Sequence, residues 1–363
     1  MTRKILLSVC FLFVFSFWLG CSDDDDDSSA DDSGDDAADD DSVQPDDDND
    51  SGDDDNDGAD DDDDTTPDGP PADPLLPGPD SYGEAALTFF DPSSNQDQPL
   101  HVFYPTADDG ATIDAGDGPR PVIVFGPGFS APMTPYFTYG SHLATYGYVV
   151  VFRNNYVVSH VDLAATTSAI IDWLEDQEAL PNSLFHGKID LEKIGTTGHS
   201  MGGKISLLTA YNDDRVKASA TIDPVDMSPL PTPAYPSVTP ELMPDIHIPT
   251  LFVGGSNGGL CAPVAENYHQ YFLYANPPSI EIMINHSGHV TFLDLPDAVI
   301  SGAALICPTG DGDYEQIRAL TKRYVTAFYQ IVFAGEEGYR YYLTGDGIAQ
   351  DVADGLVVTD SKP

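Results

Sequence analysis

The amino-acid sequence predicts an α/β fold, a doubly wound and mostly parallel sheet flanked by helices. Short β-rich runs alternate with longer helix-compatible segments, which is the pattern of parallel strands joined by crossovers. These runs are apolar on both faces or nearly so, as expected for strands covered by helices on each side. The predicted strands are 121–125, 148–152, 193–197, 217–222, 250–253 and 279–284.

Helices are predicted between these strands, at 160–180, 201–211 and 265–274. A long closing helix is predicted over 314–333. Apolar residues recur there at helical spacing, namely Ile317, Leu320, Tyr324, Phe328 and Ile331. In an open sheet of this kind ligands bind at the carboxyl ends of the strands, so the residues just after each strand are the candidates for chemistry.

Residues 1–21 are typical of a lipoprotein-type signal peptide. A basic start precedes an apolar run over 5–19, which suits a signal sequence better than a bilayer span, and the run ends in Leu-Gly-Cys. Cys21 would become the lipidated first residue of the mature protein and attach it to a membrane. The alternative is an ordinary signal peptide or an uncleaved anchor. Either way an extracytoplasmic location is expected, lipid-anchored at a membrane or the cell surface, or otherwise secreted.

Residues 22–80 are predicted to form a disordered Asp-rich linker. Residues 23–64 contain 25 Asp, and removing them changes the formal net charge from −47 to −22. Such a segment cannot bury enough apolar surface to fold, and like-charge repulsion keeps it extended. The run Asp53-x-Asp55-x-Asp57-Gly58 has the spacing of a calcium loop. In a tract this acidic the match is expected by chance, so only weak calcium binding by the linker is considered.

Residues 81–363 are predicted to form the catalytic domain, being balanced in composition and long enough for one large core. Cys261 and Cys307 are expected to form a disulfide, because Cys10 lies in the signal and Cys21 is lipidated, which leaves these two as a pair in an oxidising compartment. Two buried free thiols are the alternative. A monomer is expected, with no nucleic acid partner given the acidity, and with no metal or cofactor.

A nucleophile elbow is predicted at 198–203, Gly-His-Ser-Met-Gly-Gly, because this stretch follows a predicted strand and opens a helix. A turn this sharp brings positions 198 and 202 together, where a Cβ would crowd the serine. Ser200 is therefore the predicted nucleophile. The helix that begins at Met201 directs backbone N–H groups toward the serine oxygen. A tight glycine turn with a solvent-facing serine is the alternative.

An oxyanion site is predicted where the strand 121–125 ends, in the loop Gly-Pro-Gly-Phe-Ser at 126–130. Because Pro127 has no N–H, the amide of Phe129 is expected to act together with the amide of Met201. A glycine-rich turn without a catalytic role is the alternative.

The predicted base is His289, which follows the last predicted strand and is preceded by a glycine that leaves room for its ring. His286 in the same loop is the fallback. The other histidines lie before strands or on helices, where packing or surface roles are expected: His101, His142, His160, His186, His247 and His269.

The acid position is unusual in this sequence. After the strand 250–253, where an acid is commonly placed, residues 254–259 read Gly-Gly-Ser-Asn-Gly-Gly and contain no carboxylate. The preceding strand instead ends in Asp223, followed by proline. Asp223 is therefore predicted to orient His289 and to stabilise its imidazolium. Asp226, three residues further along, is the competitor.

These motifs resemble the chlorophyllase and cutinase-like polyester-hydrolase branch of the α/β-hydrolases. The serine motif, the Asp-Pro-Val-Asp at 223–226, the Cys-Ala-Pro at 261–263 and the Gly-His at 288–289 stand in the order seen in plant chlorophyllases. The Pro-Gly-aromatic step at 127–129 is similar to cutinase-like polyesterases. The sequence departs from plant chlorophyllases at Met201, where they commonly have Arg. The resemblance implies an α/β-hydrolase fold and an acyl-enzyme mechanism.

The predicted function is a serine carboxylic-ester hydrolase that acts on an apolar small-molecule or polymeric ester. A polyester hydrolase and a lipid or acetyl hydrolase are alternatives within enzymes, and peptidases and thioesterases share the constellation. From another class, a catalytically silent hydrolase fold could serve as a surface-binding lipoprotein. Candidate lining residues of an apolar acyl pocket are Phe129, Tyr136, Phe137, Met201, Met227 and Tyr235.

Overall fold

The computed structural model describes residues 69–107, 110–155, 159–226, 232–296, 299–300, 302 and 307–363. The chain divides into two units, Met1–Asp64 and Thr65–Pro363, and all described residues belong to the second. The predicted signal peptide, the lipidation site Cys21, the calcium-loop spacing at 53–58 and the pocket candidate Met227 lie outside the described residues.

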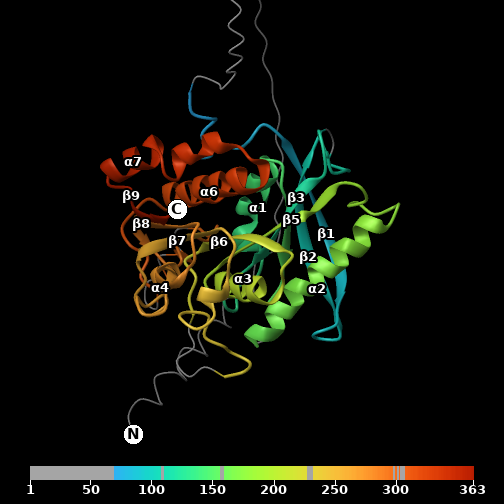
Figure 1. Ribbon diagram of the computed structural model, residues 1–363, viewed down its shortest axis with the longest axis horizontal. Coiled ribbons are helices and arrows are strands. Elements are labelled where there is room, and N and C mark those ends of the chain that lie inside the picture. Colours follow the sequence, from blue (N-terminus) through green and yellow to red (C-terminus); the bar gives the residue numbers. More distant parts are fainter. Residues whose placement is uncertain are drawn as a thin grey trace, which may run out of the picture. The chain divides into compact units, whose positions relative to one another are not determined.

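Within the described ranges a nine-stranded sheet has the order β1-β2-β4-β3-β5-β6-β7-β8-β9 (Figure 1). The six central strands run parallel to one another: β3 (Arg120–Gly126), β4 (Val149–Arg153), β5 (Ile189–His199), β6 (Val216–Ile222), β7 (Thr250–Asn257) and β8 (Ser279–Gly288). Antiparallel strands extend both edges: β1 (Ser81–Asp91), β2 (Gln96–Thr106) and β9 (Val357–Lys362). The predicted mostly parallel sheet is confirmed, and β1, β2 and β9 are additions to it.

Helices cover both faces of this sheet (Figure 1). The first face carries α1 (Phe137–Ala144) and α6 (Tyr314–Tyr329), whose buried apolar residues belong to the same core cluster as Ile123 and Phe125 of β3. The second face carries α2 (His160–Ala179), α3 (Met201–Asn212) and α4 (Tyr268–Tyr274). On that face α2 packs on Val122 and Val124, the alternate residues of the same strand. This arrangement explains why the central strands are apolar on both faces.

The closing helix α6 continues through a π-helical turn, η3 (Gln330–Ala334), and is followed by η4 (Glu337–Tyr342) and α7 (Asp346–Ala353). The predicted helix 314–333 is thus helical throughout, with a change of hydrogen-bonding pattern near its end. None of the helices in the described part of the chain combines the length and apolar character needed to cross a bilayer.

The folded unit begins earlier than the predicted boundary at residue 81. We call the segment 71–78 the N-terminal clamp, because it is held against the C-terminal helices. Asp73 forms an ion pair with Arg323 of α6, and the carbonyl of Pro71 accepts a 2.8 Å hydrogen bond from the Tyr342 hydroxyl. Leu75 packs against the main core. The apolar Pro-Leu-Leu-Pro composition at 74–77 explains why this stretch folds although the Asp-rich residues precede it.

Candidate active site

Ser200 occupies the sharp turn between β5 and α3, with φ 57° and ψ −121°. A non-glycine residue in this region is strained, and such strain collects at functional sites. The turn requires glycine on both sides. A Cβ at Gly202 would lie 1.9 Å from the carbonyl oxygen of Gly126, and a Cβ at Gly198 would lie 2.6 Å from the carbonyl carbon of Gly202. The steric reason for the predicted elbow is therefore present in the fold.

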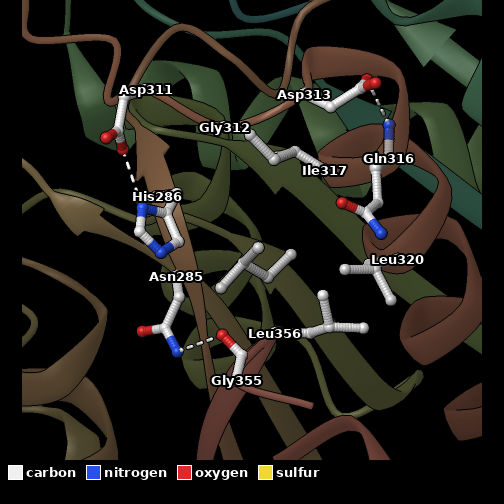
Figure 2. Close-up of a pocket in the computed structure, with 11 residues that line it drawn as sticks. Asn285, His286, Asp311, Gly312, Asp313, Gln316, Ile317, Leu320, Gly355 and Leu356 are labelled. Carbon is white, nitrogen blue, oxygen red and sulfur yellow. Dashed lines mark hydrogen bonds and ion pairs between the residues drawn. The ribbon is translucent and has the colours of Figure 1, made fainter.

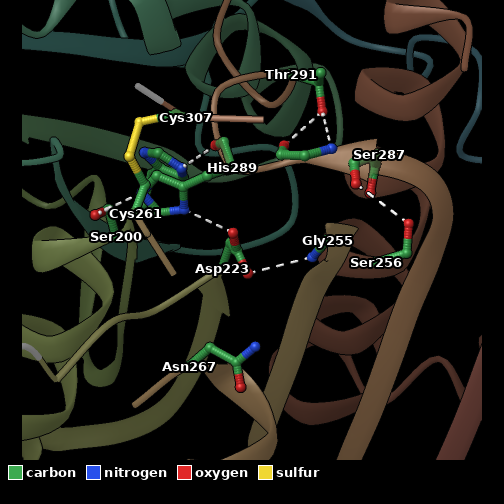
Figure 3. A network of polar contacts seen from close by, with 12 residues as sticks. Ser200, Asp223, Gly255, Ser256, Cys261, Asn267, Ser287, His289, Thr291 and Cys307 are labelled. Carbon is green, nitrogen blue, oxygen red and sulfur yellow. Dashed lines mark hydrogen bonds and ion pairs between the residues drawn. A yellow bond between two sulfur atoms is a disulfide. The ribbon is translucent and has the colours of Figure 1, made fainter. Parts of the chain in front are cut away.

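The structure brings Ser200, His289 and Asp223 together in one hydrogen-bonded row (Figure 3). His289 follows β8, and its Nε2 lies 2.9 Å from the Ser200 Oγ. Its Nδ1 lies 2.6 Å from Oδ2 of Asp223, which is fully buried at the end of β6. In this order the carboxylate holds the imidazole with its proton on Nδ1, so that Nε2 faces the serine hydroxyl as an acceptor. This is the geometry of acyl-transfer sites.

β7, the strand after which no acid was found in the sequence, supports Asp223 through its backbone. Gly255 of β7 donates its N–H to Oδ1 of Asp223 at 3.2 Å, and the N–H of Asp223 donates to the Val253 carbonyl at 2.6 Å. Beside it, a Cβ at Gly254 would lie 1.9 Å from the ring of Tyr268. Within β7, Gly254 therefore leaves room for Tyr268, and the backbone N–H of Gly255 supports Asp223.

Asp226, the competing acid, is engaged elsewhere. Its Oδ1 lies 2.6 Å from the ammonium nitrogen of Lys204, a fully buried residue of α3. Its carboxylate also accepts the backbone N–H groups of Val238 at 3.0 Å and Thr239 at 3.1 Å. Burial lowers the pKa of Lys204, and Asp226 opposes that shift. The sequence reading assigned no role to Lys204, because a lysine on a helix is ordinarily a surface residue.

The serine turn and the acid-bearing turn are hydrogen-bonded to each other directly. The N–H of Ser200 donates to the Ile222 carbonyl at 3.0 Å, and the N–H of Val225 donates to the Ser200 carbonyl at 3.3 Å. Gly203 completes the contact, since a Cβ there would lie 2.9 Å from the Pro224 Cβ. The relative position of Ser200 and Asp223 is thus fixed by the backbone and does not depend on side-chain packing alone.

The predicted oxyanion loop passes beside the serine. A Cβ at Gly128 would lie 3.5 Å from the Ser200 Cβ, so the loop is in contact with the elbow. Asn155 holds the loop from behind, because its amide group donates to the carbonyls of Pro127 at 3.1 Å and Gly128 at 2.7 Å. Phe129 follows directly and is 58% exposed, while Met201 is the first residue of α3.

A model of the chlorophyllase family matches residues 92–347 of this chain. The chain belongs to the chlorophyllase family. Chlorophyllase-1, chloroplastic, of Citrus sinensis is 25% identical over 265 residues, which cover 68% of this chain and 79% of the relative. Chlorophyllase type 0 of Chenopodium album is 24% identical over 249 residues, covering 62% and 71%.

A bis(hydroxyethyl) terephthalate hydrolase of Streptomyces coelicolor is 27% identical over 173 residues, which cover 47% of this chain and 48% of that protein. The chain is thus similar both to plant chlorophyllases and to a hydrolase of a terephthalate ester. Family and relatives together identify it as an ester hydrolase with the α/β-hydrolase fold.

His286, the alternative base in this site of the chlorophyllase family, has a different environment from His289. Its Nδ1 lies 2.7 Å from Oδ1 of Asp311, and its side chain is 66% exposed. Figure 2 shows this pair at the rim of a pocket of about 350 Å³ between the end of β8, the start of α6 and Leu356. The partner of Ser200 is His289, three residues further along the chain.

The predicted disulfide between Cys261 and Cys307 is present, with a Cα–Cα distance of 5.4 Å. It joins the loop after β7 to the segment before α6, and Figure 3 shows it next to Ser200 and His289. The residue after Cys307 packs directly on the turn that carries the base, since a Cβ at Gly288 would lie 1.9 Å from the carbonyl oxygen of Pro308. The disulfide therefore supports the backbone of the His289 turn.

The residues proposed for an acyl pocket separate into two groups. Tyr136 and Phe137 belong to the core or pack against it, and Phe137 stacks on His101 with ring centroids 4.2 Å apart. Met201 is buried at the start of α3, Tyr235 is half-buried, and Phe129 is exposed on the oxyanion loop. In the part of the chain that the structure describes, no group of three His, Cys, Asp or Glu side chains could hold a metal ion.

Proposed function

We propose that this protein is a serine carboxylic-ester hydrolase that acts on an apolar ester through an acyl-enzyme. The observation that carries the proposal is the hydrogen-bonded row of Ser200, His289 and Asp223, with contacts of 2.9 Å and 2.6 Å. A serine hydroxyl is a weak nucleophile unless an adjacent base takes its proton, and this arrangement supplies both the base and the group that orients it.

In the first half-reaction, Ser200 Oγ attacks the ester carbonyl carbon while His289 Nε2 takes the hydroxyl proton. Asp223 stabilises the imidazolium that forms. When the tetrahedral intermediate collapses, the bond to the alcohol oxygen breaks, and the alcohol leaves with the proton from Nε2. In the second half-reaction, water gives a proton to His289 and attacks the acyl carbon. The acid is released as the proton returns to Ser200.

The negative oxygen of each tetrahedral intermediate needs hydrogen-bond donors. We assign this role to the amides of Phe129 and Met201. Pro127 has no N–H, and the N–H of Gly128 donates to the hydroxyl of Tyr136 at 3.2 Å. On the oxyanion loop the assignment therefore falls on the next residue, Phe129.

For the substrate we propose an apolar or aromatic ester, with a polyester or a lipid ester as second candidate. Two exposed apolar side chains support this choice. Phe129 is on the oxyanion loop, and Leu260, which is 83% exposed, directly precedes Cys261 in the chain. The disulfide of Cys261 lies beside Ser200 (Figure 3). The similarity to a terephthalate-ester hydrolase favours an aromatic acyl group over the long chains of lipids.

The test is a chain-length series of p-nitrophenyl esters, together with bis(hydroxyethyl) terephthalate, hydrolysed by the full chain and by Ser200→Ala. We expect kcat to fall by roughly 10⁵-fold or more in the variant, the order of loss found when a triad serine is removed. Ser206→Ala is the matched control, because this serine lies on the same helix and its hydroxyl donates only to the Gly202 carbonyl among the bonds the structure gives it.

Full turnover by Ser200→Ala would rule out the serine mechanism. No turnover of any ester by the wild-type protein would favour the alternative of a silent surface-binding protein.

A further inference from the structure

His199, the residue before the serine, is buried between two other parts of the site. Its exposed fraction is 3%, and both ring nitrogens have partners. Nδ1 lies 3.0 Å from the hydroxyl oxygen of Tyr136, and Nε2 lies 2.8 Å from the backbone carbonyl oxygen of His289. The same Tyr136 oxygen accepts the N–H of Gly128 at 3.2 Å. An unbroken row of hydrogen bonds therefore runs from the oxyanion loop to the base.

Only one assignment of protons satisfies this row. A carbonyl oxygen can only accept, so Nε2 of His199 must carry the proton that it donates to His289. Burial holds the pKa of His199 well below its ordinary value, and the neighbouring His289 acts in the same direction, so the ring is neutral. Nδ1 is then bare and accepts the Tyr136 O–H. Burial also raises the pKa of Tyr136, which keeps its hydroxyl protonated.

The opposite tautomer is excluded by the same contacts. With the proton on Nδ1, the lone pair of Nε2 would face the lone pairs of the His289 carbonyl at 2.8 Å. The row is therefore fixed in direction. Gly128 donates to Tyr136, Tyr136 donates to His199, and His199 donates to His289.

We propose that Tyr136 and His199 are positioning residues that hold the oxyanion loop and the His289 turn at a fixed separation on either side of Ser200. This inference rests on the proposed serine mechanism. The oxyanion loop and the serine turn follow the paired strands β3 and β5, whereas the His289 turn follows β8, which lies three strands from β5 in the sheet. Direct strand pairing therefore does not set the height of the His289 turn against the other two turns. Space at the junction is also limited, since a Cβ at Gly128 would lie 3.1 Å from both Nδ1 of His199 and the Tyr136 oxygen.

If the Tyr136 hydroxyl only stabilised the fold, its removal would lower stability without a specific loss of kcat, whereas a positioning residue should affect kcat as well. Tyr329 supplies the matched control. It too is fully buried, and its hydroxyl also makes two hydrogen bonds, donating to the Thr196 carbonyl at 2.8 Å and accepting the Ala220 N–H at 3.2 Å. These partners lie inside β5 and β6, away from the three turns.

We therefore compare Tyr136→Phe with Tyr329→Phe in the full chain, using p-nitrophenyl butyrate and thermal unfolding. Both variants are expected to lower the unfolding midpoint to a similar degree, because each loses a buried hydroxyl with two partners. Only Tyr136→Phe is expected to lower kcat, by about 10-fold or more with KM changed less than 2-fold, since misplaced catalytic groups reduce the rate steeply. An unchanged kcat in Tyr136→Phe, or an equal loss in both variants, would overturn the proposal.

Two substitutions of His199 test the hydrogen bond from His199 to the His289 carbonyl separately from the hydrogen bond between Tyr136 and His199. The side-chain amide nitrogen of Gln can take the place of Nε2 and donate to the His289 carbonyl. The side chain of Leu has no donor. His199→Gln is expected to keep at least 10-fold more of the wild-type kcat than His199→Leu, and equal rates in the two variants would contradict the role of His199.

Two controls separate this proposal from the proposed function. Ser200→Ala is measured in the same assay, and if it retains activity the serine mechanism fails, whatever the Tyr136 result. Nitrogen-15 spectra of the wild-type protein, labelled at histidine, test the row without any assay. A neutral His199 ring with its proton on Nε2 is expected, and a proton on Nδ1 or a charged ring would overturn the proposal.

Discussion

Asp223 has a positive φ of 41°, an unusual conformation for a non-glycine residue. The contacts around it offset this strain, since the backbone N–H, one carboxylate oxygen and the other carboxylate oxygen each have a separate partner in Val253, Gly255 and His289. The side chain therefore has one position open to it, and that position faces the base.

Asp223→Asn should lower kcat by about 10⁴-fold, because an amide in place of the carboxylate favours the wrong tautomer of His289. The unfolding midpoint should change little, since the neutral amide keeps the size of the side chain. The measurement is kcat with p-nitrophenyl butyrate beside circular dichroism on heating. A variant that keeps wild-type turnover would show that another group orients His289.

Asp226→Asn should show the reverse behaviour. It leaves the buried Lys204 without its carboxylate, and removing one member of a buried pair destabilises a protein by about 3–5 kcal/mol. Below its lowered melting temperature the variant should still turn over substrate. Urea denaturation checks the stability and an assay at low temperature checks the activity. Large loss of kcat in a folded Asp226→Asn protein would move the acid role to this residue.

The sequence predicted the residues that the site brings together, because each lies directly after a strand and carries a side chain with recognisable chemistry. The contacts of three further residues could not be predicted from the sequence: Tyr136, His199 and Lys204. His199 stands inside the serine motif and Tyr136 was considered only as a pocket residue. Their partners come from other strands and helices, and no spacing along the chain encodes which buried side chains will meet.

At the scale of the elements, β1 and β9 were missed for a physical reason. β1 contains Glu-Ala-Ala-Leu, residues that favour helix, and its side chains are exposed at alternate positions, so it has no continuous apolar run. β9 reads Val-Val-Thr-Asp-Ser-Lys and has little apolar content to mark it. The central strands were predicted because burial on both faces requires continuous apolar runs, and edge strands are free of that requirement.

The disulfide is the covalent link between two loops that flank the site. Replacing Cys261 and Cys307 with serine should lower the free energy of unfolding by about 4 kcal/mol, the value expected in the chain-entropy model for a separation of 46 residues. Activity should fall as well, because the segment after Cys307 supports Gly288 beside the base. Urea denaturation of the protein with and without reductant checks this, and identical midpoints would contradict it.

At the scale of the whole molecule, several buried histidines link stability to pH. Burial lowers the pKa of His142 to about 4 and that of His160 to about 4, and it also holds the pKa of His199 well below normal. In the unfolded chain these groups titrate near 6.5, so between pH 6.5 and 4 the unfolded state binds more protons. The free energy of unfolding should therefore fall as pH is lowered through this range.

Each of His142 and His160 contributes on the order of 3 kcal/mol to that loss. Urea titrations at several pH values measure it. His142→Gln, which keeps a neutral amide at this site, should show a shallower decline than the wild-type protein. A wild-type stability that stays constant from pH 6.5 to 4 would mean that these histidines are not held neutral.

We further propose that the protein is held at a membrane through lipidated Cys21, a residue outside the described ranges. Expression in a bacterial host fed labelled palmitate should give a labelled protein in the membrane fraction, and Cys21→Ala should remove the label and release the protein. Membrane attachment without incorporated lipid would indicate an uncleaved signal anchor instead.

The N-terminal clamp determines how the enzyme responds to tension. Arg323 pairs with Asp73 on one side and with Asp351 of α7 on the other. A pull on the chain from the N-terminal side therefore acts on the Pro71–Tyr342 hydrogen bond and then on this ionic junction, before it reaches β1. While these contacts hold, we expect the load to pass into α6 and η4 and not into β5 and the serine turn. The consequence we expect from the clamp is that tension on the preceding chain leaves the catalytic geometry unchanged until these contacts break.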